Sequence, residues 1–158
     1  MSIAKATLMC LALNAYWEAR NQSYEGMVAV NQVVMNRVAS DLYPNDACEV
    51  IFQGPTRVSW KDPNKEYPIK NRCQFSWYCD GKSDEIKKEN KENLIAWRNA
   101  VRSSLEVMMR NHKDLVGGAL WYHADYVEPK WAKKMKQTTV IGKHIFYKKN
   151  NKNNDLVK

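Results

Sequence analysis

The sequence lacks several features that would point to particular classes of protein. None of its apolar runs approaches the ~20 residues of a membrane-spanning helix, so stable membrane insertion is not expected. Its four cysteines form no Cys-x-x-Cys pair and its three histidines include no closely spaced pair, so we expect neither a metal site nor another cofactor. There is no internal repeat and no recognisable nucleic-acid-binding module. Nucleophile-elbow spacing is also missing, although a Ser or Cys nucleophile beside His123 or His144 stays open.

What is present fits a single folded unit. A chain of 158 residues with 44% hydrophobic residues can bury a core of ordinary size. We expect one domain over residues 1–148, followed by a flexible Lys/Asn-rich tail over 149–158, and a monomer. The net charge of +8 favours a polyanionic partner, which includes nucleic acid, an acidic membrane and the anionic bacterial wall.

Helical spacing predicts most of the fold. Long helices are expected over residues 3–20, 26–39 and 94–112, a short helix begins after Asp46, and the charged run 83–92 is expected to start the last long helix. The apolar face predicted for the first helix consists of Ile3, Ala6, Cys10, Leu13 and Trp17. Ser23 is the expected N-cap of the second.

The remaining segments predict a small β component. Residues 53–72 are expected to form a long loop, 119–123 an extended segment, and 127–135 a brief helix. Residues 138–141 and 144–147 flank Gly142-Lys143, which predicts a hairpin. The fold class is therefore α+β, mainly helical with a small antiparallel sheet.

The cysteines allow several states. Cys10 lies on the predicted apolar helix face and is interpreted as a small core residue. Cys73 could pair with Cys79 in an oxidising compartment, and Cys48 with either of them, while free thiols are the default for a cytosolic protein.

Glu18 is the main candidate for chemistry. It falls at the end of the first predicted helix, directly after Tyr16 and Trp17. Cleavage of a glycosidic bond needs a proton donor, and burial against apolar groups raises the pKa of a carboxylic acid into the useful range. The alternative is a surface ion pair with Arg20 or Arg37, which would lower that pKa instead.

Other residues could complete a sugar site. Hydrolases of glycans use a second carboxylate, and Glu25, Asp80 and Asp125 are candidates. Without one, a lytic transglycosylase route remains, in which the C6 hydroxyl of the sugar attacks and one acid serves as donor and then base. Polar residues that lie among aromatic residues suit a sugar groove, and they are Gln74, Ser76, Tyr122 and His123.

Short motifs in a fixed order resemble the SleB-type cell-wall hydrolases, which comprise spore cortex-lytic enzymes and related bacterial and phage endolysins. The resemblance covers about residues 11–147. It is carried by Glu18-Ala19-Arg20, Tyr24-Glu25-Gly26, Asn36-Arg37-Val38, Val50-Ile51, Gln74-Phe75-Ser76-Trp77, Gly118-Ala119-Leu120 and Ile141-Gly142-Lys143-His144-Ile145-Phe146. Each motif is weak alone, but together and in this order they are specific.

The resemblance implies a lysozyme-like α+β fold and action on the glycan strands of peptidoglycan as a muramidase or a lytic transglycosylase. It also implies that Glu18 is the essential acid and that Glu25 is a supporting or groove residue. The chain differs from some members in having no separate wall-binding module or signal peptide, which fits an endolysin made in the cytoplasm and released through a holin. Its loop over residues 54–72 is longer than expected, and it has extra cysteines around Gln74-Phe75-Ser76-Trp77.

Two other functions compete with this reading. A non-catalytic wall- or nucleic-acid-binding protein would use the positive charge and aromatic residues. A peptidoglycan amidase or peptidase would release amines instead of sugar ends.

Overall fold

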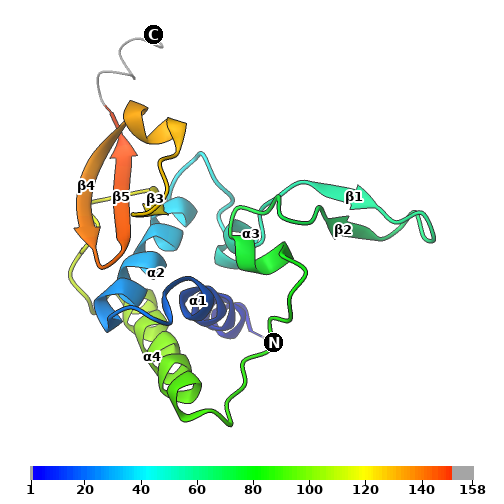
Figure 1. Ribbon diagram of the computed structural model, residues 1–158, viewed down its shortest axis with the longest axis horizontal. Coiled ribbons are helices and arrows are strands. Elements are labelled where there is room, and N and C mark those ends of the chain that lie inside the picture. The colour runs from blue at the N-terminus through cyan, green and yellow to red at the C-terminus, as the bar shows by residue number, and fades with distance from the viewer. Residues whose placement is uncertain (1, 151–158) are drawn as a thin grey trace.

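The computed structural model describes residues 2–150, which form a mainly helical α+β fold, so the predicted fold class is confirmed. The helices are α1 (Ile3–Ala19), α2 (Tyr24–Val38), α3 (Ala47–Ile51) and α4 (Lys91–Met108), with the short 3-10 helices η1 (Ser76–Cys79) and η2 (Lys130–Lys134). The strands are β1 (Thr56–Val58), β2 (Glu66–Pro68), β3 (Trp121–Ala124), β4 (Met135–Ile141) and β5 (His144–Lys149). In Figure 1 the helices lie between the sheet β3–β5–β4 and the protruding hairpin β1–β2. The predicted flexible tail over 149–158 falls outside the described residues from position 151, and β5 reaches Lys149.

Helix α1 is confirmed, but its predicted apolar face is only partly buried, with Cys10, Leu13 and Trp17 packed against the edge of a core cluster. Ile3 at the start of that face is 81% exposed. The fully buried residues lie on the adjacent face and are Leu11, Ala12, Asn14, Ala15, Tyr16 and Ala19. The reason is that α1 packs against α2, α3 and α4, and alanines allow the helices to approach closely, whereas the sequence pattern weights the larger side chains. Within residues 2–150, no helix is both long and apolar enough to cross a bilayer.

Local capping signals position the second and third helices as predicted. The Ser23 side chain accepts a hydrogen bond from Gly26 N at 3.2 Å, and Asp46 accepts one from Glu49 N at 3.0 Å. Each bond satisfies an amide that the first helical turn leaves without an intrahelical partner. Because α2 begins at Tyr24, its last turn brings Arg37 beneath the start of β3, where Arg37 Nε donates to Leu120 O at 2.7 Å.

Two segments differ from the prediction. The charged run 83–90 is irregular over residues 83–87 and turns at 88–90, and α4 starts only at Lys91 with Asn90 as its N-cap. This run has too few apolar residues to form the buried face that stabilises most helices in proteins. Residues 53–72 contain the antiparallel hairpin β1–β2, in which Arg57 pairs with Tyr67. Asp62 closes its turn by accepting from Asn64 N and Lys65 N, a local signal that the surrounding prolines and charges obscured.

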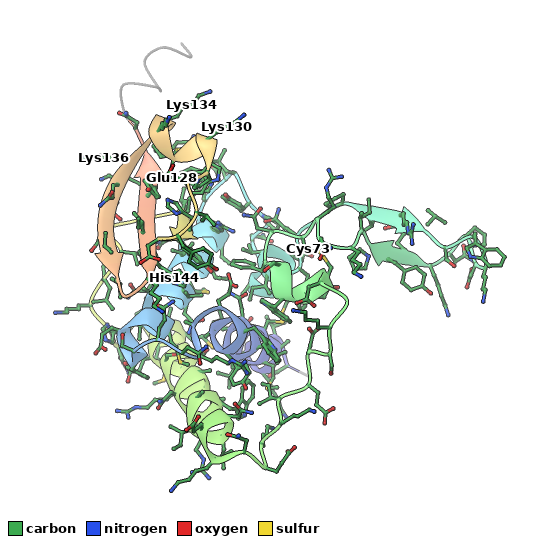
Figure 2. All side chains as sticks on the ribbon, viewed as in Figure 1. Cys73, Glu128, Lys130, Lys134, Lys136 and His144 are labelled. Atoms are coloured by element: carbon green, nitrogen blue, oxygen red, sulfur yellow. A yellow bond between two sulfur atoms is a disulfide. The ribbon has the colours of Figure 1, made fainter. Side chains whose placement is uncertain are left out.

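The C-terminal sheet follows the predicted pattern. Strand β5 lies between β3 and β4, and both pairings are antiparallel. Its β4–β5 turn contains Gly142 at φ +57°, a left-handed conformation that favours glycine. Figure 2 shows Lys130, Lys134 and Lys136 near one end of this sheet and His144 near the other, beside the helices.

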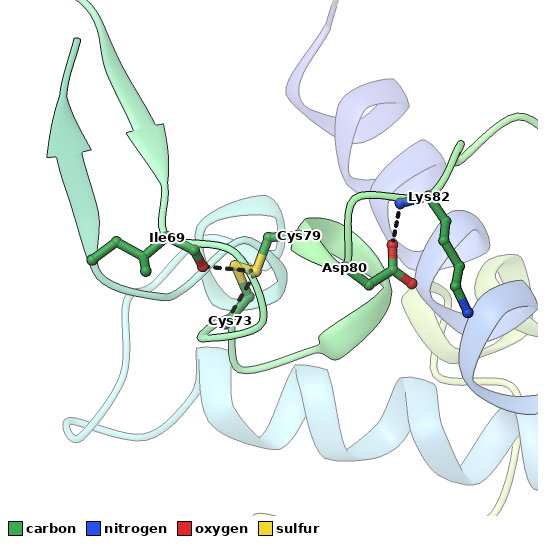
Figure 3. The surroundings of a disulfide bond; sticks show 5 residues. All are labelled: Ile69, Cys73, Cys79, Asp80 and Lys82. Atoms are coloured by element: carbon green, nitrogen blue, oxygen red, sulfur yellow. Dashed lines mark hydrogen bonds between the residues drawn. A yellow bond between two sulfur atoms is a disulfide. The ribbon is translucent and has the colours of Figure 1, made fainter. Parts of the chain in front are cut away.

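All four cysteines are paired, which corrects the interpretation of Cys10 as a single core residue. Cys10 in α1 bonds to Cys48 in α3, and Cys73 bonds to Cys79. The second pair was among the open alternatives, whereas a helical face pattern carries no information about a partner 38 residues away. Figure 3 shows that Cys79 Sγ also accepts from Cys73 N and lies against Ile69 O.

Replacing both Cys73 and Cys79 with Ser is expected to lower the free energy of unfolding by about 2 kcal/mol, the chain-entropy value for so short a loop. Urea unfolding followed by tryptophan fluorescence measures the change. An unfolding midpoint equal to that of the oxidised wild type would contradict it.

Candidate active site

Glu18 lies in the last turn of α1 and points into a cleft. Its neighbours Tyr16 and Ala19 are buried in one of the core clusters, so the backbone around it is held by packing. The Tyr122 hydroxyl, from β3, donates a hydrogen bond to Glu18 Oε1 at 2.5 Å. Glu18 itself remains partly exposed, as a group that transfers a proton to a ligand must be.

Packing against the hydrophobic core fixes the position of the Tyr122 ring. Its ring packs against all three hydrophobic clusters of the core and lies 5.4 Å from the Phe146 ring and 4.8 Å from the His144 ring, centroid to centroid. Burial and the adjacent Glu18 carboxyl hold the Tyr122 pKa well above its ordinary value, so Tyr122 keeps its proton. The hydroxyl is therefore a fixed donor aimed at Glu18.

Opposing effects set the protonation of Glu18. Burial raises its pKa, while the Tyr122 hydrogen bond and the positive charge of Arg37 lower it by smaller amounts. The ion-pair alternative is not what is found, because within residues 2–150 no salt bridge joins Glu18 to Arg20 or Arg37. The net pKa is raised, which suits an acid that donates its proton near neutral pH.

Arg37 is a buried cation beside this acid. It is 2% exposed, and its guanidinium lies 4.9 Å from the Tyr43 ring and 5.4 Å from the Phe75 ring. Burial lowers the pKa of Arg37 from the ordinary value of an arginine side chain. Its Nη1 has no hydrogen-bond partner among the described residues, and neither has the buried Nε1 of Trp17. Both residues contribute to the lining of the cleft, but these two nitrogen atoms are themselves buried behind its surface.

The cleft consists of two adjoining hollows of about 570 Å³ and about 370 Å³ with Glu18 in both. The residues common to the two are Trp17, Glu18, Ala124, Tyr126 and His144. A groove of this kind can hold an extended ligand on both sides of the acid, with aromatic rings for sugar faces and polar tips for hydroxyl groups. Among the described residues, no cluster of His, Cys, Asp or Glu is arranged to hold a metal ion.

Most residues selected from the sequence meet in the larger hollow. Gln74, Ser76, Tyr122 and His123 line it together with Glu18. His123 has both ring nitrogens engaged, with Nδ1 2.7 Å from Ala124 O and Nε2 2.8 Å from the Tyr147 hydroxyl. Contacts of these residues with a substrate stay a prediction.

The candidates for a second carboxylate lie elsewhere. Glu25 is an exposed residue in the first turn of α2 and lines neither hollow. Asp80 lines a different hollow, and Asp125 is exposed beside the cleft without lining it. Glu18 is thus the only carboxylate among the described residues that line the two hollows.

Arg37 and His144 were considered from the sequence only in other roles, Arg37 as a surface ion-pair partner of Glu18 and His144 as the partner of a Ser or Cys nucleophile, and neither was predicted to line the groove. His144 is buried, and the amide nitrogen of Gln22 lies 3.2 Å from its Nδ1. Burial lowers the pKa of His144, so its imidazole is neutral in the physiological range. Both residues belong to the ordered motifs, but no local sequence pattern predicts that Arg37 is buried or that His144 lines the same groove as Glu18.

Comparison with known proteins gives consistent matches. The family model described as cell wall hydrolase matches residues 21–147, a range that begins just after Glu18. The spore cortex-lytic enzyme of Bacillus cereus is 30% identical over 142 residues, and that of Oceanobacillus iheyensis is 31% identical over 148 residues. Each alignment covers 89% of this chain, which spans 44% and 41% of the length of these two relatives.

Solved structures agree with this family match. The catalytic domain of the germination-specific lytic transglycosylase SleB from Bacillus anthracis superposes with a TM-score of 0.63 at 29% identity, covering 90% of this chain and 93% of the other. The catalytic domain of the Bacillus cereus SleB protein gives 0.58 at 30% identity, covering 91% of each chain. These matches confirm the lysozyme-like α+β fold that the resemblance implied.

Proposed function

This chain belongs to the cell wall hydrolase family, and from that premise we propose that it cleaves the glycan strands of peptidoglycan as a lytic transglycosylase. Residues 1–148 form the catalytic domain in this proposal. The observation that carries it is a groove in which Glu18, a carboxyl group whose pKa is raised by burial, is the only acid among the described lining residues. A solved relative at 29% identity bears the description lytic transglycosylase, which supports the same choice.

The number of carboxyl groups in the groove distinguishes between the known mechanisms of glycan cleavage. Inverting and retaining glycosidases use two carboxyl groups that flank the bond, about 5–9.5 Å apart. Glu18 has no such partner in the groove among the described residues. A mechanism in which the substrate supplies its own nucleophile needs no second carboxylate, and this favours the transglycosylase over the hydrolase.

The proposed reaction begins with proton transfer. Glu18 donates its proton to the oxygen that links C1 of N-acetylmuramic acid to N-acetylglucosamine, and the C1–O bond breaks. The C6 hydroxyl oxygen of the same muramic acid bonds to C1 and gives its proton to the Glu18 carboxylate. The products are a 1,6-anhydro end and a free hydroxyl, no water is consumed, and Glu18 returns to its starting state.

The surroundings of Glu18 suit this double role. Burial favours the acid before the reaction, whereas the Tyr122 hydroxyl and the Arg37 charge stabilise the carboxylate formed in the middle of it. The acid and its conjugate base are thus closer in energy than burial alone would leave them.

The proposed place of action is the cell wall. Synthesis in the cytoplasm and release through a holin would bring the chain there if it is a phage enzyme. Support comes from the two disulfides, which persist in oxidising surroundings, and from the net charge of +8, which aids adsorption to an anionic wall. We propose that it acts as a monomer and does not bind nucleic acid.

Mass spectrometry of purified peptidoglycan digested with the protein tests this function. We expect muropeptides that end in 1,6-anhydromuramic acid. Reducing muramic acid ends would point to a hydrolase, new amines without new sugar ends to an amidase, and no soluble product to a binding protein. Each of these outcomes contradicts the proposal.

A further inference from the structure

The hairpin segment 54–72, called the arm below, projects from the molecule without joining its core. Figure 1 shows β1 and β2 extending away from the helices and the C-terminal sheet, and Figure 2 shows their side chains reaching into open space. None of residues 54–72 is buried. A two-stranded hairpin that does not pack against the rest of the protein is only marginally stable. The conformation of the arm must therefore be held by contacts at its base.

Hydrogen bonds and a disulfide at the base of the arm hold it in place. Backbone bonds of 2.8 Å join Gln74 N to Gln53 O and Asn71 N to Cys79 O, and the Cys73–Cys79 disulfide closes the loop that follows. Gly54 approaches Cys73 so closely that a Cβ there would lie 2.9 Å from Cys73 Cα. The arm is thus clamped directly before Gln74 and Ser76, two residues that line the larger hollow.

The side chains displayed by the arm are unusual for an exposed hairpin. Trp60 is 88% exposed and Tyr67 51% exposed. Lys61 Nζ lies 5.3 Å from the Trp60 ring, and Arg57 is the cross-strand partner of Tyr67. Over residues 54–72 there are five Lys or Arg against two acids. Trp60 belongs to none of the three core clusters. The hairpin thus displays two exposed aromatic residues with neighbouring cations, and Trp, Tyr and Arg are the residue types enriched at the energetic centres of binding surfaces.

We propose that the arm is a second contact site for peptidoglycan, at which Trp60 and Tyr67 pack against sugar rings and the nearby cations pair with carboxylates of the stem peptides. The proposal rests on the proposed function for the identity of the polymer. Charge complementarity and the direct connection to the groove wall support this occupant. Asp62 and Glu66 interrupt the positive charge, which disfavours an anionic lipid surface, since such surfaces attract uninterrupted basic clusters.

Co-sedimentation with insoluble purified peptidoglycan tests the arm. The background is Glu18→Gln, so that the polymer is not degraded during the measurement. Adding Trp60→Ala and Tyr67→Ala is expected to weaken binding about tenfold, the effect of losing a well-placed aromatic contact. Ile95→Ala, which trims an exposed apolar side chain on α4, is the matched control and should bind like the background variant. Circular dichroism melting verifies that every variant is folded.

Equal binding with and without the two aromatic side chains would overturn the proposal. The same variants are also tested for binding to vesicles that contain phosphatidylglycerol. If loss of the two aromatic side chains weakens binding to the vesicles but not to peptidoglycan, the arm is a lipid contact and the proposal is overturned. Failure of the proposed function appears separately, as soluble fragments released by Glu18→Gln or none released by the wild type. Even in that case, the fraction bound to peptidoglycan can be compared between Glu18→Gln and the variant that also lacks the two aromatic side chains, and this comparison tests the arm.

Discussion

Glu18→Gln is expected to lower the rate of glycan-strand cleavage by about 10³-fold or more, since a positioned general acid contributes roughly 10²–10⁴ to the rate. Glutamine can still accept the hydrogen bond from Tyr122 but has no proton to give to the leaving oxygen. The measurement is the initial rate of release of soluble muropeptides from peptidoglycan. Glu89→Gln, at an exposed position in the charged run before α4, is the matched control and should retain the wild-type rate.

Thermal unfolding distinguishes loss of chemistry from loss of fold. Because burial raises the folded-state pKa of Glu18 above its unfolded value, the stability linked to its proton is complete below the unfolded pKa and is lost as the pH rises through the folded pKa. Glutamine cannot ionise and avoids this loss. The variant should therefore melt at or above the wild-type temperature at neutral pH, and substantial turnover in such a folded variant would remove Glu18 from the mechanism.

Tyr122→Phe is expected to slow cleavage about 100-fold and to move the alkaline limb of the pH–rate profile to higher pH. The substitution removes a hydrogen bond that stabilises the Glu18 carboxylate, so the pKa of Glu18 rises further and the acid keeps its proton to higher pH. The rate falls because the carboxylate formed during proton transfer loses a charged hydrogen bond, of about 1.5–3 kcal/mol, and each 1.36 kcal/mol changes a rate tenfold. The profile of kcat/KM against pH measures both effects.

The phenylalanine ring retains the packing of Tyr122 against Phe146 and His144, so a purely structural defect would lower the rate without moving the limb. Tyr24→Phe, which removes a hydroxyl from a side chain that lines neither hollow, serves as the control and should leave the profile in place. A limb that stays at its wild-type pH or moves to lower pH in Tyr122→Phe would contradict the role given to the hydroxyl.

The predictability of the site differed from residue to residue. Glu18 stood out because one acid next to aromatic residues at a helix end is a local pattern, and it does lie in the cleft. Gln74, Ser76, Tyr122 and His123 were chosen as polar residues among aromatics, and the fold brings them together. Glu25, selected as a candidate second carboxylate and again through the resemblance, lines neither hollow, because its side chain faces solvent while Gly26 and Met27 of the same turn face the core.

Arg37 shows why part of the site could not be predicted from the sequence. In the sequence it is one of 25 Lys and Arg residues and reads as a surface cation. In the structure it is buried between Tyr43 and Phe75 and bonded to Leu120 O, 83 residues away along the chain. Its effect on Glu18 depends on that burial, which no short window of sequence records.

Local signals in the sequence alone determined where α2 and α3 begin, where the C-terminal hairpin turns and which glutamate lies at the end of the first helix, because capping bonds and turn conformations depend on neighbours within about four residues. Only the tertiary structure decided the face that α1 buries, the pairing of Cys10 with Cys48, the outward course of the arm and the contact of Tyr122 with Glu18 across 104 residues. These depend on packing between distant segments, and packing also sets the solvent exposure that decides whether a carboxyl keeps its proton.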